Sequence, residues 1–241
     1  MNAFIRTLYL ALLIFMSPWA FSQQGLTLTT SLGLEHFNTI GEFVLIEAYK
    51  KLDIEVKVLR VPSKRALTMS NSGLSDGEVH RIKSITKKFT NLVQSPVPIN
   101  HVDIVAFSKY PGMKINNHQD LKSYSIAHTK GAVIYEKITT GFPEVITVLK
   151  PRQGLMMLAN NRVDIFLADS LVGPATIKEN SIQGVYMLSP PVKTIHMYHC
   201  LNKNKSDLIP KITQVLKAME ASGRIKEIRD QYMIEYFEKF D

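Results

Sequence analysis

The sequence predicts an α/β protein of two lobes, each built on a mostly parallel sheet flanked by helices. Strand-like and helix-like segments alternate along the first half of the chain, and the same alternation returns in the second half. No flexible linker separates the two halves, so we expect the backbone to cross between the lobes more than once. With 241 residues, 45% of them apolar, the chain is long enough for two lobes with cores of their own.

Composition narrows the class of protein. The apolar content rules out a disordered chain, and the lone Cys200 excludes an intramolecular disulfide. The 29 basic and 21 acidic residues give a formal net charge of +8, which favours the approach of anionic ligands. The basic residues form no stripe interleaved with aromatic side chains, so we expect no nucleic-acid partner.

Residues 1–22 have the features of a secretory signal peptide. Arg6 precedes an apolar run over residues 8–16, a Ser17-Pro18 breaker follows, and small residues stand at Ala20 and Ser22. The apolar run is about nine residues long, whereas a membrane-spanning helix needs roughly 20. We therefore expect cleavage before Gln23 and export to a bacterial periplasm, with an uncleaved anchor as the weaker alternative.

The first half of the mature chain reads as strand, helix, strand, helix. Leu and Thr alternate over residues 26–31, and valines mark a second strand over residues 55–61. Between them, apolar residues at helical spacing predict a helix of about three turns: Ile40, Phe43, Val44, Ala48 and Leu52. A second helix over residues 64–69 is expected to begin with Ser63 as its N-cap.

The second half repeats these elements. Strands are expected over residues 102–107, 125–128, 163–167 and 194–201, and a helix over residues 154–160. We interpret Gly173-Pro174 as a turn. Two helices separated by Gly223 are expected to end the chain.

Three segments resemble the periplasmic solute-binding proteins of the extracellular family 3 type, which include polar amino acid receptors of ABC importers. They are residues 75–81 (SDGEVHR), residues 161–169 (NRVDIFLAD), and the ending over residues 201–232 with its leucine-rich helix, Gly223 and Tyr232. The resemblance implies the two-lobed Venus flytrap fold, with a signal peptide over residues 1–22, lobe 1 from residues 23–108 and 192–241, and lobe 2 from residues 109–191. The crossovers would fall near residues 107–110 and 188–192. A monomer that binds a small molecule without a cofactor, for a membrane permease or a sensor, is implied as well.

Arg81 and Asp169 are the principal candidate site residues that the resemblance implies. In the family's amino acid receptors an arginine of the first lobe holds the ligand carboxylate, and an aspartate of the second lobe holds the ammonium. A guanidinium presents a planar set of donors that matches a carboxylate. The alternatives are a surface ion pair of Arg81 with Asp76 or Glu78, and a helix or turn cap by Asp169.

Six further residues are weaker candidates for the site. Arg65 lies in the first turn of a predicted helix, where a cation opposes the helix dipole. Glu78 is expected to hold Arg81 in place or to contact a cationic group of the ligand. Thr30 and Ser31 end the first strand, where they either bond the ligand or cap the next turn, and Lys130 with Gly131 resembles a carboxylate-binding loop.

The chain departs from the family at two places. Ala132 and Val133 follow Gly131 where the family's amino acid receptors have a hydroxyl residue, and a ligand-stacking aromatic after the first strand is replaced, with Phe37 either substituting for it or filling the core. Both departures argue against an ordinary α-amino acid as the ligand.

Metal and catalytic functions are less well supported. His196 and His199 are three residues apart in a predicted strand, so they point to opposite faces and do not share a metal ion with Cys200. We expect no metal and no catalytic residue. A dehydratase-like enzyme on the same scaffold, with Glu78 or Asp169 as general acid, is the alternative function.

Overall fold

The computed structural model describes residues 25–32, 35–115, 117–131 and 133–239. The predicted signal peptide, residues 1–22, lies outside the described residues. The strands are β1 (Leu26–Ser31), β2 (Val56–Val61), β3 (Gly77–Ile82), β4 (Leu92–Ser108), β5 (Ile126–Thr129), β6 (Val145–Val148), β7 (Ile165–Asp169), β8 (Tyr186–Met187) and β9 (Lys193–Asn202). The helices are α2 (Glu35–Lys50), α3 (Ser63–Ser72), α4 (Val133–Thr139), α5 (Pro151–Ala159), α6 (Val172–Glu179), α7 (Leu208–Ala221) and α8 (Arg224–Glu238), with short 3₁₀ segments η1 (Lys83–Lys87), η2 (His118–Ser123) and η3 (Lys203–Lys205).

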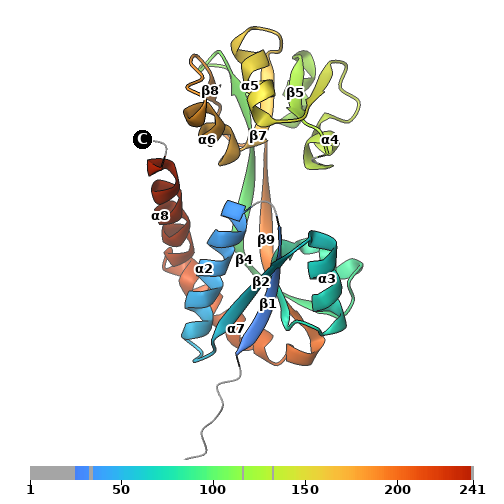
Figure 1. Cartoon of the computed structure of the whole chain (residues 1–241), viewed down its shortest axis with the longest axis vertical. Coiled ribbons are helices and arrows are strands. Elements are labelled where there is room, and N and C mark those ends of the chain that lie inside the picture. Colours follow the sequence, from blue (N-terminus) through green and yellow to red (C-terminus); the bar gives the residue numbers. More distant parts are fainter. Residues whose placement is uncertain (1–24, 33–34, 116, 132, 240–241) are drawn as a thin grey trace, which may run out of the picture.

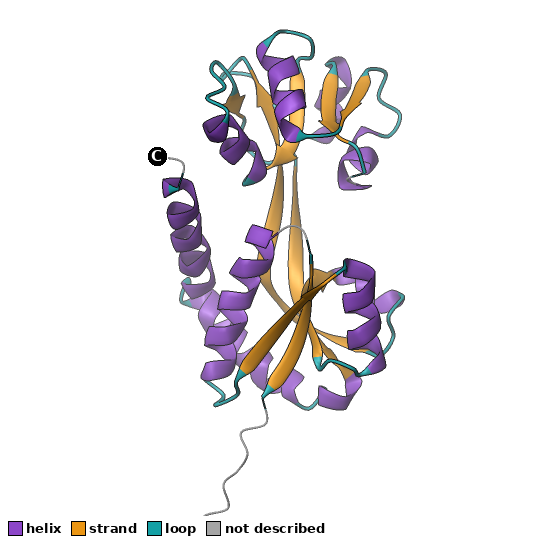
Figure 2. Ribbon diagram, in the orientation of Figure 1, coloured by secondary structure: helices purple, strands orange, loops and turns teal. Residues whose placement is uncertain are grey.

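Two lobes are joined by the long strands β4 and β9, which run from one lobe into the other (Figures 1 and 2). Hydrogen bonds connect the strands in the order β2-β1-β3-β9-β4-β7-β5-β6, and β8 pairs with β4. β4 pairs with β9 as far as Ile104 and with β7 of lobe 2 from Ile104 to Phe107. The expected crossover near residues 107–110 therefore lies where β4 is already part of the lobe 2 sheet.

Lobe 2 has a core on each face of its sheet. Val105 and Phe107 of β4 belong to one apolar cluster, and Ile104 and Ala106 belong to the other. The residues of β7 divide in the same way between the two faces. Both faces are buried because helices or loops cover each of them, which explains why this part of the sequence is continuously apolar rather than alternating.

Lobe 1 buries its own core around β1, β3 and β9. Leu28, Val79 and Leu201 of these strands are fully buried against Val44 of α2 and Leu216 of α7. The segments that supply this core lie at both ends of the chain, so lobe 1 completes its packing only when the chain has returned from lobe 2.

Two local predictions are wrong. Ser63 does not cap α3: the N-cap is Pro62, no side chain caps the helix, and the Ser63 hydroxyl accepts a hydrogen bond from Arg81. Gly173 and Pro174 lie in the first turn of α6 rather than in a turn. A proline is tolerated there because a backbone N–H in the first turn has no acceptor within the helix.

Gly173 is required where it stands because α6 approaches β4 closely. A Cβ at this position would lie 2.2 Å from the Phe107 ring. Among the described helices, none is long and apolar enough to cross a membrane.

We predict that Gly77→Ala strongly destabilises the protein. A Cβ at Gly77 would lie 2.2 Å from the carbonyl oxygen of Cys200 and 2.9 Å from the Cα of Leu201, and backbone atoms of a paired strand cannot move aside cheaply. The free energy of unfolding in urea should fall by about 2 kcal/mol or more. Gly112→Ala is the control, because no atom lies within 4 Å of its Cβ position, and equal stability of the two variants would contradict the prediction.

Candidate functional site between the two strand edges

The strand directions place the ends of six strands between the lobes. β4 enters lobe 2 from lobe 1, and β7 is antiparallel to it, so β7 runs back toward lobe 1 together with the parallel strands β5 and β6. In lobe 1, β3 is antiparallel to the incoming β9 and therefore runs toward lobe 2, as do β1 and β2. We call the two edges where these strands end the facing edges (Figure 1). Carboxyl ends of parallel strands are where open α/β sheets bind ligands.

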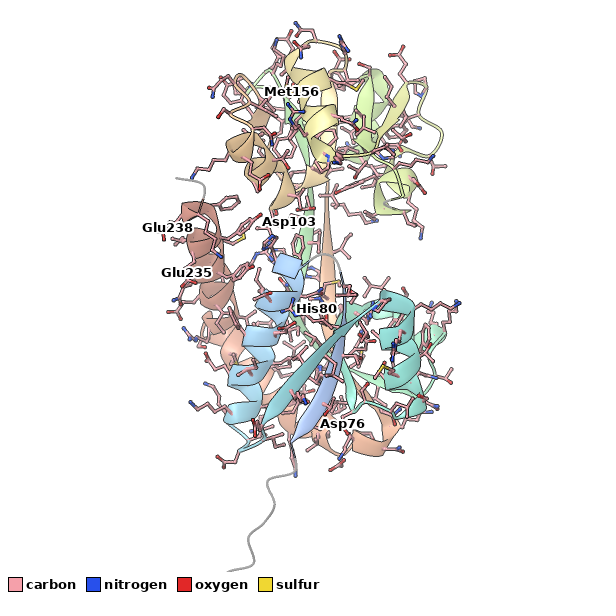
Figure 3. The ribbon with its side chains drawn as sticks, viewed as in Figure 1. Asp76, His80, Asp103, Met156, Glu235 and Glu238 are labelled. Carbon is pink, nitrogen blue, oxygen red and sulfur yellow. The ribbon has the colours of Figure 1, made fainter. Side chains whose placement is uncertain are left out.

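Figure 3 shows the direction of β3 through its labelled side chains. Asp76, just before β3, lies at the end of lobe 1 far from lobe 2, whereas His80 lies nearer to it, and Asp103 stands between the lobes. Arg81, one residue after His80, is therefore close to the facing edge of lobe 1.

Arg81 and Glu78 form an ion pair within lobe 1. Arg81 Nε donates to Glu78 Oε2 at 2.9 Å, and Arg81 Nη1 donates to the Ser63 hydroxyl at 3.0 Å. The Glu78 side chain is fully buried and that of Arg81 is 13% exposed. The expectation that Glu78 holds Arg81 in place agrees with this geometry. The alternative of a surface ion pair is wrong, because the pair of Arg81 with Glu78 is buried. Asp76, the other partner considered, pairs with Lys205 instead.

Arg81 keeps donors that the chain does not use. Its Nη2 is ion-paired with Glu78 Oε2 at 2.8 Å, and this buried atom makes no hydrogen bond to a described residue. A buried donor without an acceptor costs free energy. An oxygen acceptor brought against this nitrogen would remove that cost, and because the atom is buried, neighbouring side chains would have to move to admit it.

Apart from Arg81, the side chains described around the Glu78 carboxylate are neutral. Burial raises the pKa of Glu78 to about 7, against the opposing effect of Arg81 and of the Ser70 hydroxyl, which donates to Oε1 at 3.2 Å. His199 Nδ1 donates to the backbone oxygen of Glu78 at 2.8 Å, and burial lowers the pKa of His199 to about 4. His199 is therefore neutral, and Arg81 is the cation that faces the carboxylate.

The other lobe 1 candidates lie at the same edge. Arg65 is exposed on the first turn of α3 and makes no hydrogen bond or ion pair with any described residue. Thr30 is buried near the end of β1 and Ser31 is its last residue, whose carbonyl accepts from Asn38 at 2.7 Å. The edge thus presents one unpaired guanidinium, Arg65, beside the ion-paired Arg81.

Asp169 ends β7 and caps α6. Its Oδ1 accepts from the backbone N–H of Leu171 at 3.0 Å and of Val172 at 2.7 Å, and Oδ2 takes no part in this cap. Burial raises the pKa of Asp169, and the two backbone donors oppose that rise. Asp169 therefore caps α6 and also lies at the facing edge of lobe 2. Arg81 and Asp169 make no contact with each other.

Lys130 and Gly131 follow β5 at the facing edge of lobe 2. Lys130 is exposed, and Gly131 has a positive φ of 82°, which glycine adopts without strain. The Gly131 N–H donates to Glu136 Oε1 of α4 at 3.3 Å. The chain's own carboxylate thus occupies the donor that the resemblance assigns to a ligand.

The sequence alone did not indicate that α8 connects the lobes. Leu171 of lobe 2 is fully buried against Phe37 and Ile40 of α2, with Tyr232, Met233 and Phe237 of α8 packed on the same cluster. Lys178 Nζ of α6 donates to the Phe237 carbonyl at 3.1 Å. Phe37 therefore belongs to the core, and the idea that it stacks on a ligand is wrong. The one signal of this contact in the sequence is the presence of the aromatic residues Tyr232 and Phe237 on the last helix.

Histidines do not gather into a metal site in the described part of the chain, where no group of three or more His, Cys, Asp or Glu residues is arranged to hold an ion. His196 of β9 faces His101 of the paired strand β4, with ring centroids 6.2 Å apart, whereas His199 is buried in lobe 1 against Tyr49. The two carboxyls named for an enzyme, Glu78 and Asp169, are both engaged by their own chain.

Comparisons with known proteins agree with this architecture. No protein-family model matches the sequence. An uncharacterised protein from Shewanella oneidensis strain MR-1 is 25% identical over 202 residues, which cover 79% of this chain and 75% of that protein.

Solved structures show the fold. The L-cystine solute receptor of Neisseria gonorrhoeae, unliganded and open, matches with a TM-score of 0.69 at 17% identity over 88% of this chain and 94% of that one. The GluR0 ligand-binding core with L-glutamate matches with 0.64 at 15% identity over 88% and 99%. A histidine kinase sensor domain similar to periplasmic binding proteins matches with 0.60 at 12% identity over 87% and 96%. The predicted type II periplasmic-binding-protein fold is confirmed.

We predict that Glu78→Gln makes the stability of the protein more sensitive to acid. Burial lowers the pKa of His80 to about 3 and that of His199 to about 4, so each costs about 1.4 kcal/mol of stability per pH unit below 6.5, where the unfolded histidine takes up a proton. Glu78, with its raised pKa of about 7, acts oppositely: the folded state holds the extra proton, and stability rises as the pH falls from 7 to 4.5.

The test is the free energy of unfolding in urea from pH 6.5 to 4.5. Its slope should be steeper in Glu78→Gln than in the unaltered protein by about 1.4 kcal/mol per pH unit. Parallel curves for the two proteins would show that Glu78 does not take up a proton in this range.

Proposed function

We propose that this protein is an exported binding protein that closes its lobes around a small carboxylate-bearing solute and presents the closed form to a membrane permease or a sensor. The observation that carries the proposal is the Arg81 guanidinium: it lies near the facing edge of lobe 1, is held by Glu78 and Ser63, and has in Nη2 a nitrogen that is ion-paired with Glu78 but makes no hydrogen bond to a described residue. A ligand carboxylate would offer this guanidinium oxygen atoms in a geometry suited to hydrogen bonds.

Lobe 2 would supply the second half of the site. Asp169 Oδ2 would accept from a donor group of a solute that carries one, because Oδ1 is used by the cap of α6. Lys130 and Gly131 would contribute if the ligand displaces Glu136 from the Gly131 N–H. Thr30, Ser31 and Arg65 would complete the lobe 1 edge.

Closure has an energetic requirement. A change in the closed population from 1:99 to 99:1 needs about 5.5 kcal/mol of preferential binding to the closed form. Hydrogen bonds to charged groups contribute about 1.5–3 kcal/mol each, so contacts to both lobes together are sufficient, whereas contacts to one lobe favour neither form. This is why the proposal needs both facing edges.

Export supports the proposed setting. Residues 1–22 have the pattern of a signal peptide, and the solved structures that share the fold include a solute receptor and a sensor domain. We therefore propose a periplasmic location after cleavage and a monomer as the binding unit.

We predict that Arg81→Ala abolishes the thermal stabilisation that a carboxylate ligand produces. A panel of amino acids, dicarboxylates and apolar monocarboxylates, with small amines for comparison, would be screened by thermal shift, and affinities measured by calorimetry. Loss of two charge-assisted hydrogen bonds, at about 1.5–3 kcal/mol each, should weaken binding by about 100-fold or more.

Two further variants make this test decisive. Arg81→Ala with Glu78→Gln removes the buried carboxylate that would otherwise lose its partner, so that loss of binding is separated from loss of folding. Arg162→Ala is the matched control, because Arg162 is exposed just before β7 begins, at the edge of lobe 2 away from lobe 1. Undiminished carboxylate binding by the double variant would refute the role of Arg81.

A further inference from the structure

Large apolar side chains are exposed at both facing edges. On lobe 1, Leu32 follows β1 and Ile82 ends β3; on lobe 2, Val133 begins α4 and Leu149 follows β6. Their exposed fractions are 55% for Leu32, 43% for Ile82, 60% for Val133 and 78% for Leu149. Single exposed apolar residues are ordinary on a protein surface. These four differ because the strand directions turn their two edges toward each other.

Exposed cations stand at the same edges. Lys64 and Arg65 lie in the first turn of α3, Lys130 follows β5, and Lys150 precedes α5. Of the carboxylates at the lobe 2 edge, Asp169 is buried with Oδ1 in the cap of α6, and Glu136 Oε1 accepts from the Gly131 N–H. Asp103, between the lobes, lies 3.2 Å from His101 Nε2 and accepts a hydrogen bond from the Thr194 hydroxyl. Apart from this engaged carboxylate, the facing edges combine apolar surface with positive charge.

This combination specifies a ligand class, and the inference rests on the proposed function. We infer that the solute is an amphiphilic anion, a carboxylate attached to an aliphatic or aromatic body, rather than a polar zwitterionic amino acid. Ligand sites are mostly apolar with a few well-placed polar groups. Arg81 and the exposed cations serve the carboxylate, while Leu32, Val133 and Leu149 lose their exposure to water against the apolar body when the lobes close.

The charge at lobe 2 supports an anion over a zwitterion. An α-ammonium at the lobe 2 edge would share that edge with the exposed cations Lys130 and Lys150, while the carboxylate of Asp169 is buried. A ligand without an ammonium avoids this repulsion. The replacement of the family's hydroxyl residue after Gly131 by Ala132 and Val133 agrees with a less polar partner.

Calorimetry with four named probes tests the inference. Octanoate and phenylacetate carry a carboxylate on an apolar body, and succinate and L-glutamine carry one without it. We expect octanoate and phenylacetate to bind the purified protein once per chain, at least about tenfold more tightly than the other two.

Two leucine variants localise the effect. Leu149→Ser should weaken octanoate binding about tenfold and leave succinate binding unchanged. Leu74→Ser is the matched control: Leu74 is 75% exposed just after α3 ends, at the opposite edge of lobe 1, and its loss should change neither.

The outcomes separate this inference from the function on which it rests. Tighter binding of succinate or L-glutamine than of octanoate and phenylacetate would overturn the ligand class and leave the proposed function standing. If none of the four probes binds, the proposed function fails together with the inference. Equal octanoate affinities in Leu149→Ser and Leu74→Ser would overturn the role of the lobe 2 edge.

Discussion

The antiparallel pairing of β4 with β9 is the constraint on which the rest of the structure depends. These two strands are shared by both lobes, and each lobe adds its other strands to them in a fixed direction. Because β7 and β3 are both antiparallel to their long neighbours, every parallel strand of one lobe ends facing the other lobe. Side chains at strand ends that are remote in the sequence are thereby directed to one place between the lobes.

Lobe 1 neutralises Arg81, the residue proposed to bind the ligand, with a carboxylate of its own. The buried carboxylate of Glu78 holds Arg81 in one orientation, and burial raises the pKa of Glu78 although Arg81 and the Ser70 hydroxyl oppose the rise. Arg81 Nη2 makes no hydrogen bond to a described residue, which lowers the stability of the free protein. Under the proposed function, a carboxylate ligand would supply that hydrogen bond. The α8 helix adds a second constraint, since its contacts with Leu171 and Lys178 tie lobe 2 to lobe 1 beside the hinge strands. A closing motion has to keep or exchange these contacts.

Much of this architecture could be predicted from the sequence. Alternating Leu and Thr located β1 within its observed bounds, and the apolar run before Asp169 located β7 to within two residues. Local patterns failed where a tertiary contact decided the outcome. Ser63 was expected to cap a helix and instead binds Arg81, 18 residues further along the chain. The Gly173-Pro174 pair looked like a turn, because nothing in the sequence shows that β4 requires a glycine for close packing.

The candidate site was also predictable only in part from the sequence. The resemblance placed Arg81 and Asp169 near strand ends, and the strand directions bring both to the facing edges. The burial of the Arg81–Glu78 pair and the capping of α6 by Asp169 depend on which atoms meet in the folded chain, so the sequence could only offer them as alternatives. The bridge made by Tyr232 and Phe237 involves residues about 60 positions from α6, and the aromatic residues on the final helix do not by themselves identify their partner.

The most direct measurement is the distance between the lobes with and without a bound solute. Spin labels on Lys87→Cys in η1 and Lys122→Cys in η2 are exposed on different lobes, and Cys200 is buried. Pulsed electron resonance would compare the free protein with the protein saturated by a carboxylate that raises its melting temperature. A shorter, narrower distance distribution on saturation is expected if the lobes close around the solute. An unchanged distribution under saturation would contradict closure between the facing edges.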